Sequence, residues 1–472
     1  FPAWRSFFEH IARQGTTLLV LEDLQWADPG LLSFIDHLAS WSQDVPICMV
    51  TLTRPELLDV RPDWGTGPRA TSISLGPLDR SSMQSLLKGL VPGLPETTRD
   101  HIVDRADGVP LYAVETVRML VNDGRLVLRD GAYAPTGELT ALDPPETLRA
   151  LVASRLDALD GDDRDLLQSA AVLGHTFSAD ALATITDTTS ADLEPRLRTL
   201  VRREMLVLQA DSRSPDRGQY AFSQELLRDV AYETLARDER RKRHLAAARY
   251  FESLDADELA GALATQYQAA YRSAREGPEA DALAIQARRS LKAAADRARS
   301  LGSTEQAEQL YEAALELARE PSDEAELLVL AAEAAVRAGN AARGSTWLGR
   351  AIELYRELGD RSEMARATAA LVDATLHDGW QLEAARAIAR DAVDELEDLG
   401  TDEGLAELLG QLARIEMLRQ DDFSLAIALA DRALAMAERL DLRSLVADLL
   451  ITRGTAPVSY THLTLPTTLN SC

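Results

Sequence analysis

A helical pattern that repeats through the C-terminal half of the chain limits the possible folds more than any other feature. An alanine followed by a large aliphatic residue recurs at intervals of about 40 residues, at Ala314, Ala351, Ala392 and Ala433. Small residues at helix crossings let neighbouring helices approach closely, and stacked pairs of helices then bury one continuous core. The pattern predicts a stack of paired helices over residues 255–455.

The turns between the paired helices support this prediction. Gly302, Gly339 and Gly379 stand between the two helices of the first three units, and Asp421-Asp422 take that place in the last. The array resembles a tetratricopeptide superhelix whose units are longer than usual. That resemblance implies a concave surface that binds a protein or a peptide. A plain helical bundle is the alternative.

A second constraint is the apolar run 17–21, which leads directly into Glu22 and Asp23. Such a run predicts a parallel strand that is covered on both faces. Acids at the carboxyl end of a strand lie where open α/β sheets bind ligands. One carboxylate there can hold Mg²⁺ against nucleotide phosphates, and a second can orient the attacking water. An ordinary buried strand followed by a capped turn is the alternative.

The residues around this run predict a βαβ unit. We expect helices over 5–14 and 29–41, with Asp28 as the N-cap of the second. A second apolar strand over 46–53 ends next to Arg54, and residues 71–76 are expected to form a further strand. A helix between two apolar strands indicates a parallel sheet.

The residues that follow the first strand read Glu22-Asp-Leu-Gln-Trp-Ala-Asp-Pro29. They resemble the Walker B segment of STAND-class AAA+ ATPases, the signalling NTPases of large bacterial regulators. The resemblance implies an NTPase core over 1–76 that uses ATP or ADP with Mg²⁺. Glu22 and Asp23 would hold the metal, Asp23 would activate water, and Arg54 would read the γ-phosphate. Asp23 stands where a Glu is usual, which fits slow hydrolysis.

A helical lid is expected over 77–140, with helices near 77–90, 96–107 and 110–123 and a hairpin over 124–140. Gly108-Val-Pro110 opens the third helix. Locally, this is a turn followed by proline at the first helical position. It also resembles the Gly-x-Pro motif of the lid in these ATPases, which implies that Pro110 packs on the adenine.

Short helices and two β-like segments over 141–254 predict a winged helix. The segment from Phe222 to Tyr232 resembles a family motif, Phe-x-His-x-Leu-x-Arg-x-x-Ala-Tyr, whose histidine contacts ADP. Gln224 occupies that position here, and it can donate a hydrogen bond but carries no charge. The arginines of helix 191–203 and the basic cluster 237–244 are compatible with DNA binding. We favour the alternative interpretation, in which these residues lie on solvent-exposed helix faces that also contain acids.

The chain contains no Gly-x-x-x-x-Gly-Lys-Ser/Thr segment. In the family this phosphate-binding loop lies upstream of the Walker B strand, so we expect the sequence to be a fragment that binds ATP weakly by itself. Residues 456–472 resemble a translated sequencing adapter, and a natural Pro/Thr-rich tail is the alternative. The expected output domain, a nucleotide cyclase, a kinase or a LuxR-type regulator, is also missing.

Composition excludes several classes of protein. A net charge of −26 argues against non-specific binding to nucleic acid or anionic membrane. The two cysteines, Cys48 and Cys472, exclude a disulfide framework and fit a cytoplasmic protein. We expect no membrane partner, DNA contact only through an output domain, and self-oligomerisation as an option of the ATP-bound form. A repeat scaffold with a degenerate ATPase and an origin-recognition-type DNA-binding ATPase are the competing interpretations.

Overall fold

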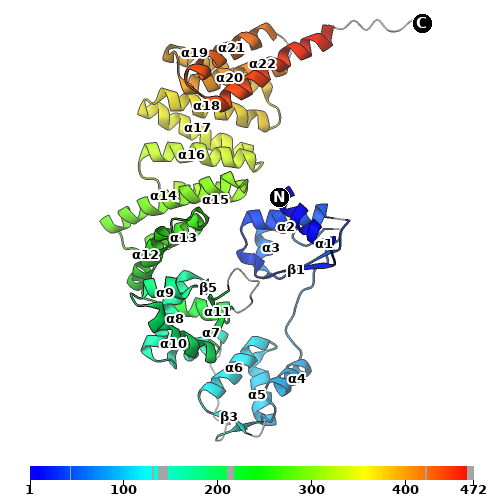
Figure 1. Cartoon of the computed structure of the whole chain (residues 1–472), viewed down its shortest axis with the longest axis vertical. Coiled ribbons are helices and arrows are strands. Elements are labelled where there is room, and N and C mark those ends of the chain that lie inside the picture. The colour runs from blue at the N-terminus through cyan, green and yellow to red at the C-terminus, as the bar shows by residue number, and fades with distance from the viewer. Residues whose placement is uncertain are drawn as a thin grey trace, which may run out of the picture. The chain divides into compact units, whose positions relative to one another are not determined.

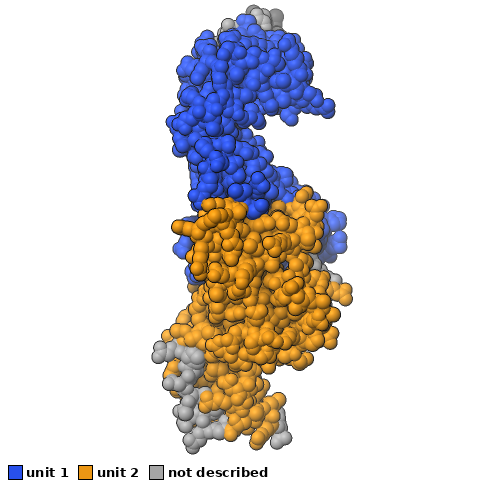
Figure 2. Space-filling view, turned by 90° about the vertical axis from the view of Figure 1, so that its left-hand side faces the viewer, with its two compact units in different colours: residues 1–62, 284–472 blue, residues 63–283 orange. Residues whose placement is uncertain are grey.

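The computed structural model describes residues 1–42, 44–67, 69–129, 132–136, 147–209, 217–419 and 423–464, with side chains up to residue 455. Contacts divide the chain into two units, Phe1–Pro62 with Ala284–Cys472, and Asp63–Leu283 (Figure 2). Each unit is described by itself. The finer domain limits expected from the sequence stay predictions.

The first unit begins with the predicted βαβ arrangement. Strands β1 (Thr17–Leu21) and β2 (Ile47–Thr51) pair in parallel, with Thr17 opposite Ile47 and Leu21 opposite Thr51. Helix α2 (Pro29–Trp41) connects them, and the carboxylate of Asp28 accepts a hydrogen bond from the Leu31 amide at 3.0 Å. The remaining elements of this part are α1 (Pro2–Ala12), the short 3₁₀ helix η1 (Leu24–Trp26) and α3 (Glu56–Val60).

Two expectations about strands are wrong. The apolar run of β1 predicted a strand covered on both faces, but Leu18 and Val20 are 60% and 52% exposed and Val50 on β2 is 41% exposed. Alternate side chains of a strand point to opposite faces, and here only the other face is half-buried. Residues 71–76 form no strand, and Leu75 is 88% exposed. Apolar β-prone residues form a strand only where a neighbouring strand pairs with them, and none of the described sheets includes these residues.

The second part of this unit is the predicted stack of helices, which Figure 1 shows in green to red. Its helices are α14 (Pro278–Ser300), α15 (Thr304–Leu315), α16 (Pro321–Arg337), α17 (Ala341–Leu358), α18 (Arg361–His377), α19 (Leu382–Leu396), α20 (Glu403–Arg419), α21 (Phe423–Arg439) and α22 (Arg443–Thr464). From α15 to α22 each helix packs on the next along the chain, so the region is solenoid-like, as the repeat predicted.

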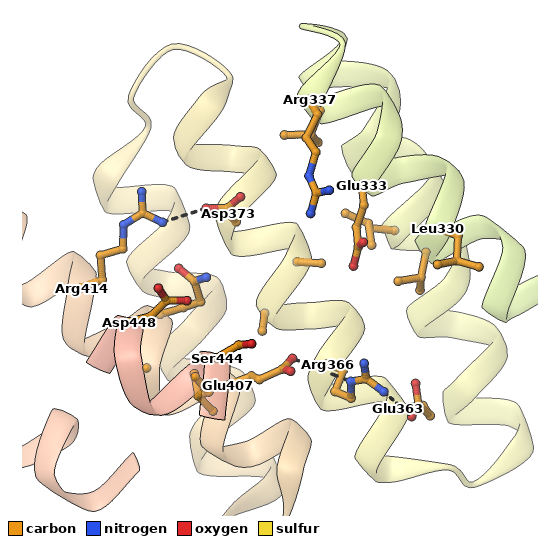
Figure 3. Close-up of a pocket in the computed structure, with 18 of the residues that line it drawn as sticks. Leu330, Glu333, Arg337, Glu363, Arg366, Asp373, Glu407, Arg414, Ser444 and Asp448 are labelled. Atoms are coloured by element: carbon orange, nitrogen blue, oxygen red, sulfur yellow. Dashed lines mark hydrogen bonds and ion pairs between the residues drawn. The ribbon is translucent and has the colours of Figure 1, made fainter. Parts of the chain in front are cut away.

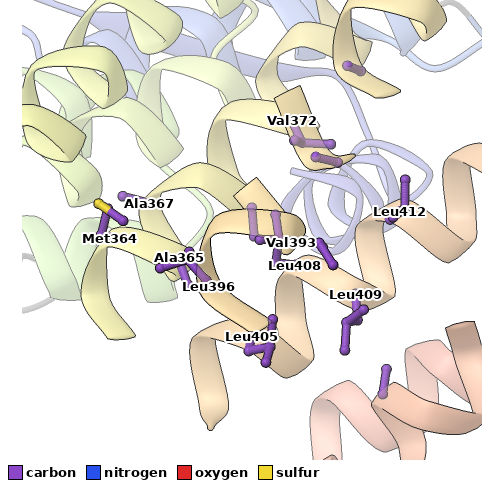
Figure 4. Packing of buried hydrophobic residues seen from close by; sticks show 14 of the residues in the cluster. Met364, Ala365, Ala367, Val372, Val393, Leu396, Leu405, Leu408, Leu409 and Leu412 are labelled. Carbon is purple, nitrogen blue, oxygen red and sulfur yellow. The ribbon is translucent and has the colours of Figure 1, made fainter. Parts of the chain in front are cut away.

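The residues that define the repeat lie where the sequence placed them. Ala314, Ala351 and Ala433 are fully buried on α15, α17 and α21, and Ala392 is half-buried on α19. The turn glycines adopt left-handed backbone, for example φ +93° at Gly339. One apolar cluster continues through α16 to α22, and Figure 4 shows its part around α18 and α20.

The structure describes two parts of the repeat region only incompletely: the turn of the last unit and the C-terminal end. Asp421-Asp422 lie outside them. Helix α22 continues to Thr464, beyond Gly454, where the helical pattern of the sequence ends. Residues 465–472 and the side chains from residue 456 onward also lie outside the described part, and this includes most of the adapter-like segment and Cys472.

The second unit starts with a compact set of three helices and a hairpin. Helices α4 (Arg80–Leu90), α5 (Glu96–Ala106) and α6 (Pro110–Asn122) are followed by the antiparallel strands β3 (Leu126–Arg129) and β4 (Ala132–Pro135). Met83, Leu87, Ile102 and Leu120 form the centre of their common core. The hairpin is therefore present, and the two residues between its strands, Asp130 and Gly131, lie outside the described residues.

The part over residues 141–254, for which a winged helix is predicted, follows. It contains α7 (Leu148–Asp157), α8 (Gly161–Leu173), α9 (Ala179–Ile185), α10 (Ser190–Arg202), β5 (Thr176–Phe177), β6 (Leu206–Leu208) and β7 (Tyr220–Phe222). The strands form an antiparallel sheet in the order β5-β7-β6. Two strands were predicted, and β5 was missed because its two residues are too few to show an alternating pattern. Helices α11 (Glu225–Glu233), α12 (Arg237–Ser253) and α13 (Ala260–Ser273) complete the unit.

Candidate functional site

The predicted acids and the predicted arginine lie at the same edge of the parallel β1–β2 pair. Glu22 and Asp23 directly follow β1, and Arg54 lies three residues after the end of β2. Two backbone hydrogen bonds extend the pairing beyond the strands: the Leu52 amide donates to Leu21 at 2.8 Å, and the Leu24 amide donates to Leu52 at 3.1 Å. The carboxyl ends of both strands are thereby held together, and their polar side chains are exposed to solvent.

Gln25 connects the acid and the arginine segment. Its Nε2 donates to Asp23 Oδ1 at 3.0 Å, and its Oε1 accepts from the backbone amide of Arg54 at 3.2 Å. Asp23 adopts left-handed backbone (φ +55°) as the chain turns into η1. Gln25 stands inside the segment that resembles a Walker B, but its position in the sequence did not indicate this bridging contact.

The chemistry of this edge fits a magnesium–phosphate ligand. Mg²⁺ prefers oxygen ligands and commonly keeps several waters beside one or two carboxylates and substrate phosphates. Glu22 and Asp23 supply two adjacent exposed carboxylates. Among the described residues, no group of three or more His, Cys, Asp or Glu is placed to hold a metal ion, so any metal here would depend on water and phosphate oxygens.

The Gly-x-Pro segment has a clear backbone function. Gly108 has φ +77°, and a Cβ atom there would lie 2.6 Å from Pro77 Cβ and 2.7 Å from the Leu78 carbonyl oxygen. The Leu78 amide donates to the Gly108 carbonyl at 2.8 Å, which fixes the close approach of the two segments. Pro110 is the first residue of α6, and its exposed ring is accessible to a ligand. Its contact with adenine stays a prediction.

Gln224, the residue at the histidine position of the motif, lies at the start of α11. Its Nε2 donates to Glu115 Oε1 on α6, the helix that begins at Pro110. Its Oε1 is buried without a hydrogen-bond partner in the described part of the chain. The structure therefore connects two predicted nucleotide-contacting segments within the second unit, while the contact of Gln224 with ADP remains a prediction.

Glu115 is the centre of a buried polar network that the sequence analysis missed. Its side chain is fully buried and forms ion pairs with Arg155 on α7 and, at 2.8 Å, with Arg118. Arg118 also contacts Glu204 at 2.8 Å. The available signal was helical spacing: Glu115 lies three positions after Tyr112, and Arg155 lies four positions after Leu151, so both charges fall on the apolar faces of their helices.

Several of the basic residues that admitted DNA binding are paired with acids of the same unit. Arg196 on α10 contacts Asp162 at 2.6 Å and Asp163 at 3.2 Å, and Arg198 contacts Glu194 at 2.8 Å. In the basic cluster 237–244 the side chains likewise find intramolecular partners, for example Lys242 with Glu239 at 2.8 Å and Arg237 with backbone carbonyls. This pairing agrees with the interpretation as solvated helix faces.

Two further observations concern membrane-spanning segments and the cysteine Cys48. In the described residues, no helix combines the length and the apolar character needed to span a membrane. Cys48 on β2 is a free, exposed thiol.

Comparisons with known proteins give distant similarities. No protein-family model matches the sequence. An uncharacterized protein of Rhizobium meliloti (strain 1021) is 24% identical over 242 residues, which are 50% of this chain and 22% of that protein. The chain thus spans less than a quarter of the length of this curated relative.

Two solved structures are also similar. One is a Signal Transduction ATPase with Numerous Domains (STAND) protein with a tetratricopeptide repeat sensor from Pyrococcus horikoshii. It is 14% identical with a TM-score of 0.38, over 94% of this chain and 65% of that chain. The other is BtubC from P. vanneervenii, which is 18% identical with a TM-score of 0.30, over 49% of this chain and 96% of that chain.

Proposed function

We propose that this chain is the central part of a STAND-type signalling ATPase, in which a nucleotide-dependent switch is coupled to helical repeats that sense a partner. The observation that carries the proposal is the connection of Asp23 to the Arg54 backbone through Gln25 at the carboxyl ends of two parallel strands. This is the edge at which α/β sheets bind ligands, and the surrounding residues resemble a Walker B segment.

The chemistry assigned to each residue follows from its charge and position. Glu22 would help to hold Mg²⁺, and Asp23 would orient the water that attacks the γ-phosphate. Arg54 stabilises charge that develops on the phosphate oxygens. Gln25 would keep the Asp23 carboxylate next to the backbone of the Arg54 segment.

The phosphate-binding loop would come from another segment of the full protein. The 472 residues include no Gly-rich loop that ends in Lys-Ser or Lys-Thr. The exposed apolar face formed by Leu18, Val20 and Val50 gives such a segment a surface to cover. The output domain, a nucleotide cyclase or a LuxR-type regulator on the sequence resemblance, would likewise lie outside this chain.

The test compares the 472-residue chain with the longer gene product that includes the upstream residues. We expect Mg²⁺-dependent ATP binding and slow hydrolysis in the longer protein and weak binding in the chain alone. Asp23→Asn should lower kcat of the longer protein by about 100-fold or more, because the water loses its base. Asp59→Asn removes an exposed carboxylate from α3 and serves as the matched control.

The same experiment distinguishes the nucleotide-dependent switch from a second candidate function, a repeat scaffold. A groove in the repeats is formed without any residue of the β1–β2 part, so the chain could act as a repeat scaffold with a degenerate ATPase. Absence of ATP binding by the longer protein would favour this scaffold over the switch. Tight ATP binding by the 472-residue chain alone would contradict an externally supplied loop.

A further inference from the structure

A groove of about 1070 Å³ runs along the repeats. Helices α16, α18, α20 and α22 line it, and each contributes residues three or four positions apart, which lie on one face of a helix (Figure 3). Neighbouring packed helices lie about 8–10 Å apart, so four of them span roughly 25–30 Å. An extended segment of about eight or nine residues covers that distance.

Acidic side chains outnumber basic ones in the lining of this groove. The basic residues are Arg299, Arg337, Arg366 and Arg414. The acidic residues are Glu326, Glu333, Asp360, Glu363, Asp373, Glu407 and Asp448. The groove therefore has an excess of negative charge, and lysine and histidine are absent from its described lining.

Two of these acids have cationic partners at 3.4 Å, Glu326 with Lys292 and Glu333 with Arg299. Arg414 pairs with Asp373 at 2.9 Å, whereas Arg366 is shared between Glu363 at 3.0 Å and Glu407 at 3.8 Å. Asp448 on α22 is exposed and has no ion-pair partner among the described residues. Carboxylates that share one guanidinium, or have none, gain most from an additional cation.

Three side chains with acceptor oxygens, Glu407, Gln411 and Asp448, line the groove on α20 and α22. Burial raises the pKa of the Glu407 carboxyl, and the nearby acids Glu403, Glu333 and Glu363 add to this effect against Arg366. Gln411 lies one turn after Glu407, and its Oε1 is buried without a hydrogen-bond partner in the described part of the chain. Figure 3 shows Glu407 and Asp448 on neighbouring helices with Ser444 beside them.

We propose that this groove binds an extended cationic segment of a partner protein, with one Lys or Arg side chain placed among Glu407, Gln411 and Asp448. An ammonium or guanidinium group has only donors, and this end of the groove offers acceptors. Apolar side chains at both ends, such as Leu330 and Ile451, suit aliphatic residues on either side of the cation. A second copy of this chain is a poor occupant, because both copies have a net charge of −26.

This inference deepens the proposed sensing role of the repeats, but its test needs no nucleotide and can succeed or fail independently of the ATPase. The probe is a fluorescein-labelled library of nonapeptides with a fixed central arginine and flanks of Leu, Val and Ser. Matched libraries have citrulline or glutamate at the centre; citrulline keeps the shape of arginine without its charge. Binding to the full chain is measured by fluorescence anisotropy at two salt concentrations.

The groove variant is the double substitution Glu407→Gln with Asp448→Asn. Its control is Glu357→Gln with Asp391→Asn, which removes two exposed acids from α17 and α19 outside the groove and changes the net charge equally. We expect the arginine library to bind about tenfold or more tightly than the citrulline library, and the groove variant to lose that preference while the control keeps it.

Three results would overturn the proposal. Equal binding of arginine and citrulline libraries would exclude cation recognition. An equal loss in both double variants would indicate non-specific attraction, and binding of spermine without any peptide binding would indicate a polyamine site. If the groove variant fails to fold by circular dichroism, Gln411→Leu decides: it removes the unpartnered acceptor without a change of charge, and it should weaken arginine binding more than citrulline binding, because hydrogen bonds from a charged donor are stronger.

Discussion

Arg155 on α7 forms an ion pair with Glu115 on α6 in which the two side chains are only 2% and 0% exposed. Taking both charges out of water is expensive, and their attraction offsets that cost only while both partners are present. Arg118 and Gln224 complete the contacts of the Glu115 carboxylate. The Glu115–Arg155 ion pair therefore fixes how α6 packs against α7.

Substitution Arg155→Met should lower the free energy of unfolding by about 3–5 kcal/mol, because Glu115 loses its fully buried partner. The double variant Glu115→Leu with Arg155→Met should recover most of this loss. Urea denaturation followed by circular dichroism measures both. Arg118→Met removes a half-buried partner and should cost about 1 kcal/mol or less. A single variant as stable as the parent would show that the pair contributes no stability.

Gly108→Ala should destabilise the second unit by about 2–3 kcal/mol, since it combines a left-handed backbone with a Cβ too close to Pro77 and Leu78. Gly124 is a matched control: its φ is +65°, but a Cβ there meets nothing within 4 Å. Gly124→Ala should cost only about 1 kcal/mol. Thermal and urea unfolding compare the two. Equal losses would mean that the close approach at Gly108 adds no cost.

His244 on α12 is buried as a neutral imidazole. Its Nδ1 lies 2.7 Å from Gln266 Oε1, which only accepts, so Nδ1 is the donor and Nε2 accepts from the Tyr232 hydroxyl at 2.8 Å. Burial lowers the pKa of His244 below its usual 6.5, Arg240 and Arg228 lower it further, and the Gln266 hydrogen bond opposes them. The folded state therefore binds the proton less readily than the unfolded state.

Stability should consequently fall as the pH drops below about 6.5, because the unfolded chain takes up a proton that the folded chain refuses. The contribution of one group is at most about 1.4 kcal/mol per pH unit between its two pKa values. Urea denaturation of the parent and of His244→Gln from pH 7.5 to 5 measures this contribution. The effects of other titrating groups cancel when the free energies of unfolding of the two proteins are subtracted. Parallel curves for the two proteins would contradict this account.

Gln25→Leu should lower kcat for ATP hydrolysis by the longer, nucleotide-binding protein about 10- to 100-fold with little change in KM. Gln25 touches no substrate in the proposed mechanism but positions Asp23 beside the Arg54 segment. Gln14→Leu, at an exposed site after α1, controls for loss of an amide. A rise in KM at constant kcat would instead assign Gln25 to nucleotide binding.

The chain should not bind duplex DNA at physiological salt. Arg196 and Arg198 on α10 are already paired with acids, and the net charge is −26. A gel-shift titration with random-sequence duplexes measures this directly. A complex whose affinity falls steeply with salt concentration would revive the origin-recognition-type interpretation, because such a slope reports phosphate contacts.

Local features of the sequence were enough to place most elements. Asp28 caps α2 as its position indicated, and the glycines of the repeat occupy left-handed turns. These features depend on residues a few positions apart, and helical periodicity depends on one face of one element. Residues 71–76 show the limit of this reasoning: they have the composition of a strand, but strand formation needs a partner elsewhere in the chain.

The sequence by itself determined the helices, the repeat and the acids at the end of β1. The tertiary structure alone decided which distant groups meet: Glu115 with Arg155, Gln25 with the Arg54 amide, and Glu407 with Arg366. Spacing along the chain cannot reveal such pairs, because a charged or amide side chain finds its partner only after separate elements have packed. Burial then sets what each contact costs or contributes.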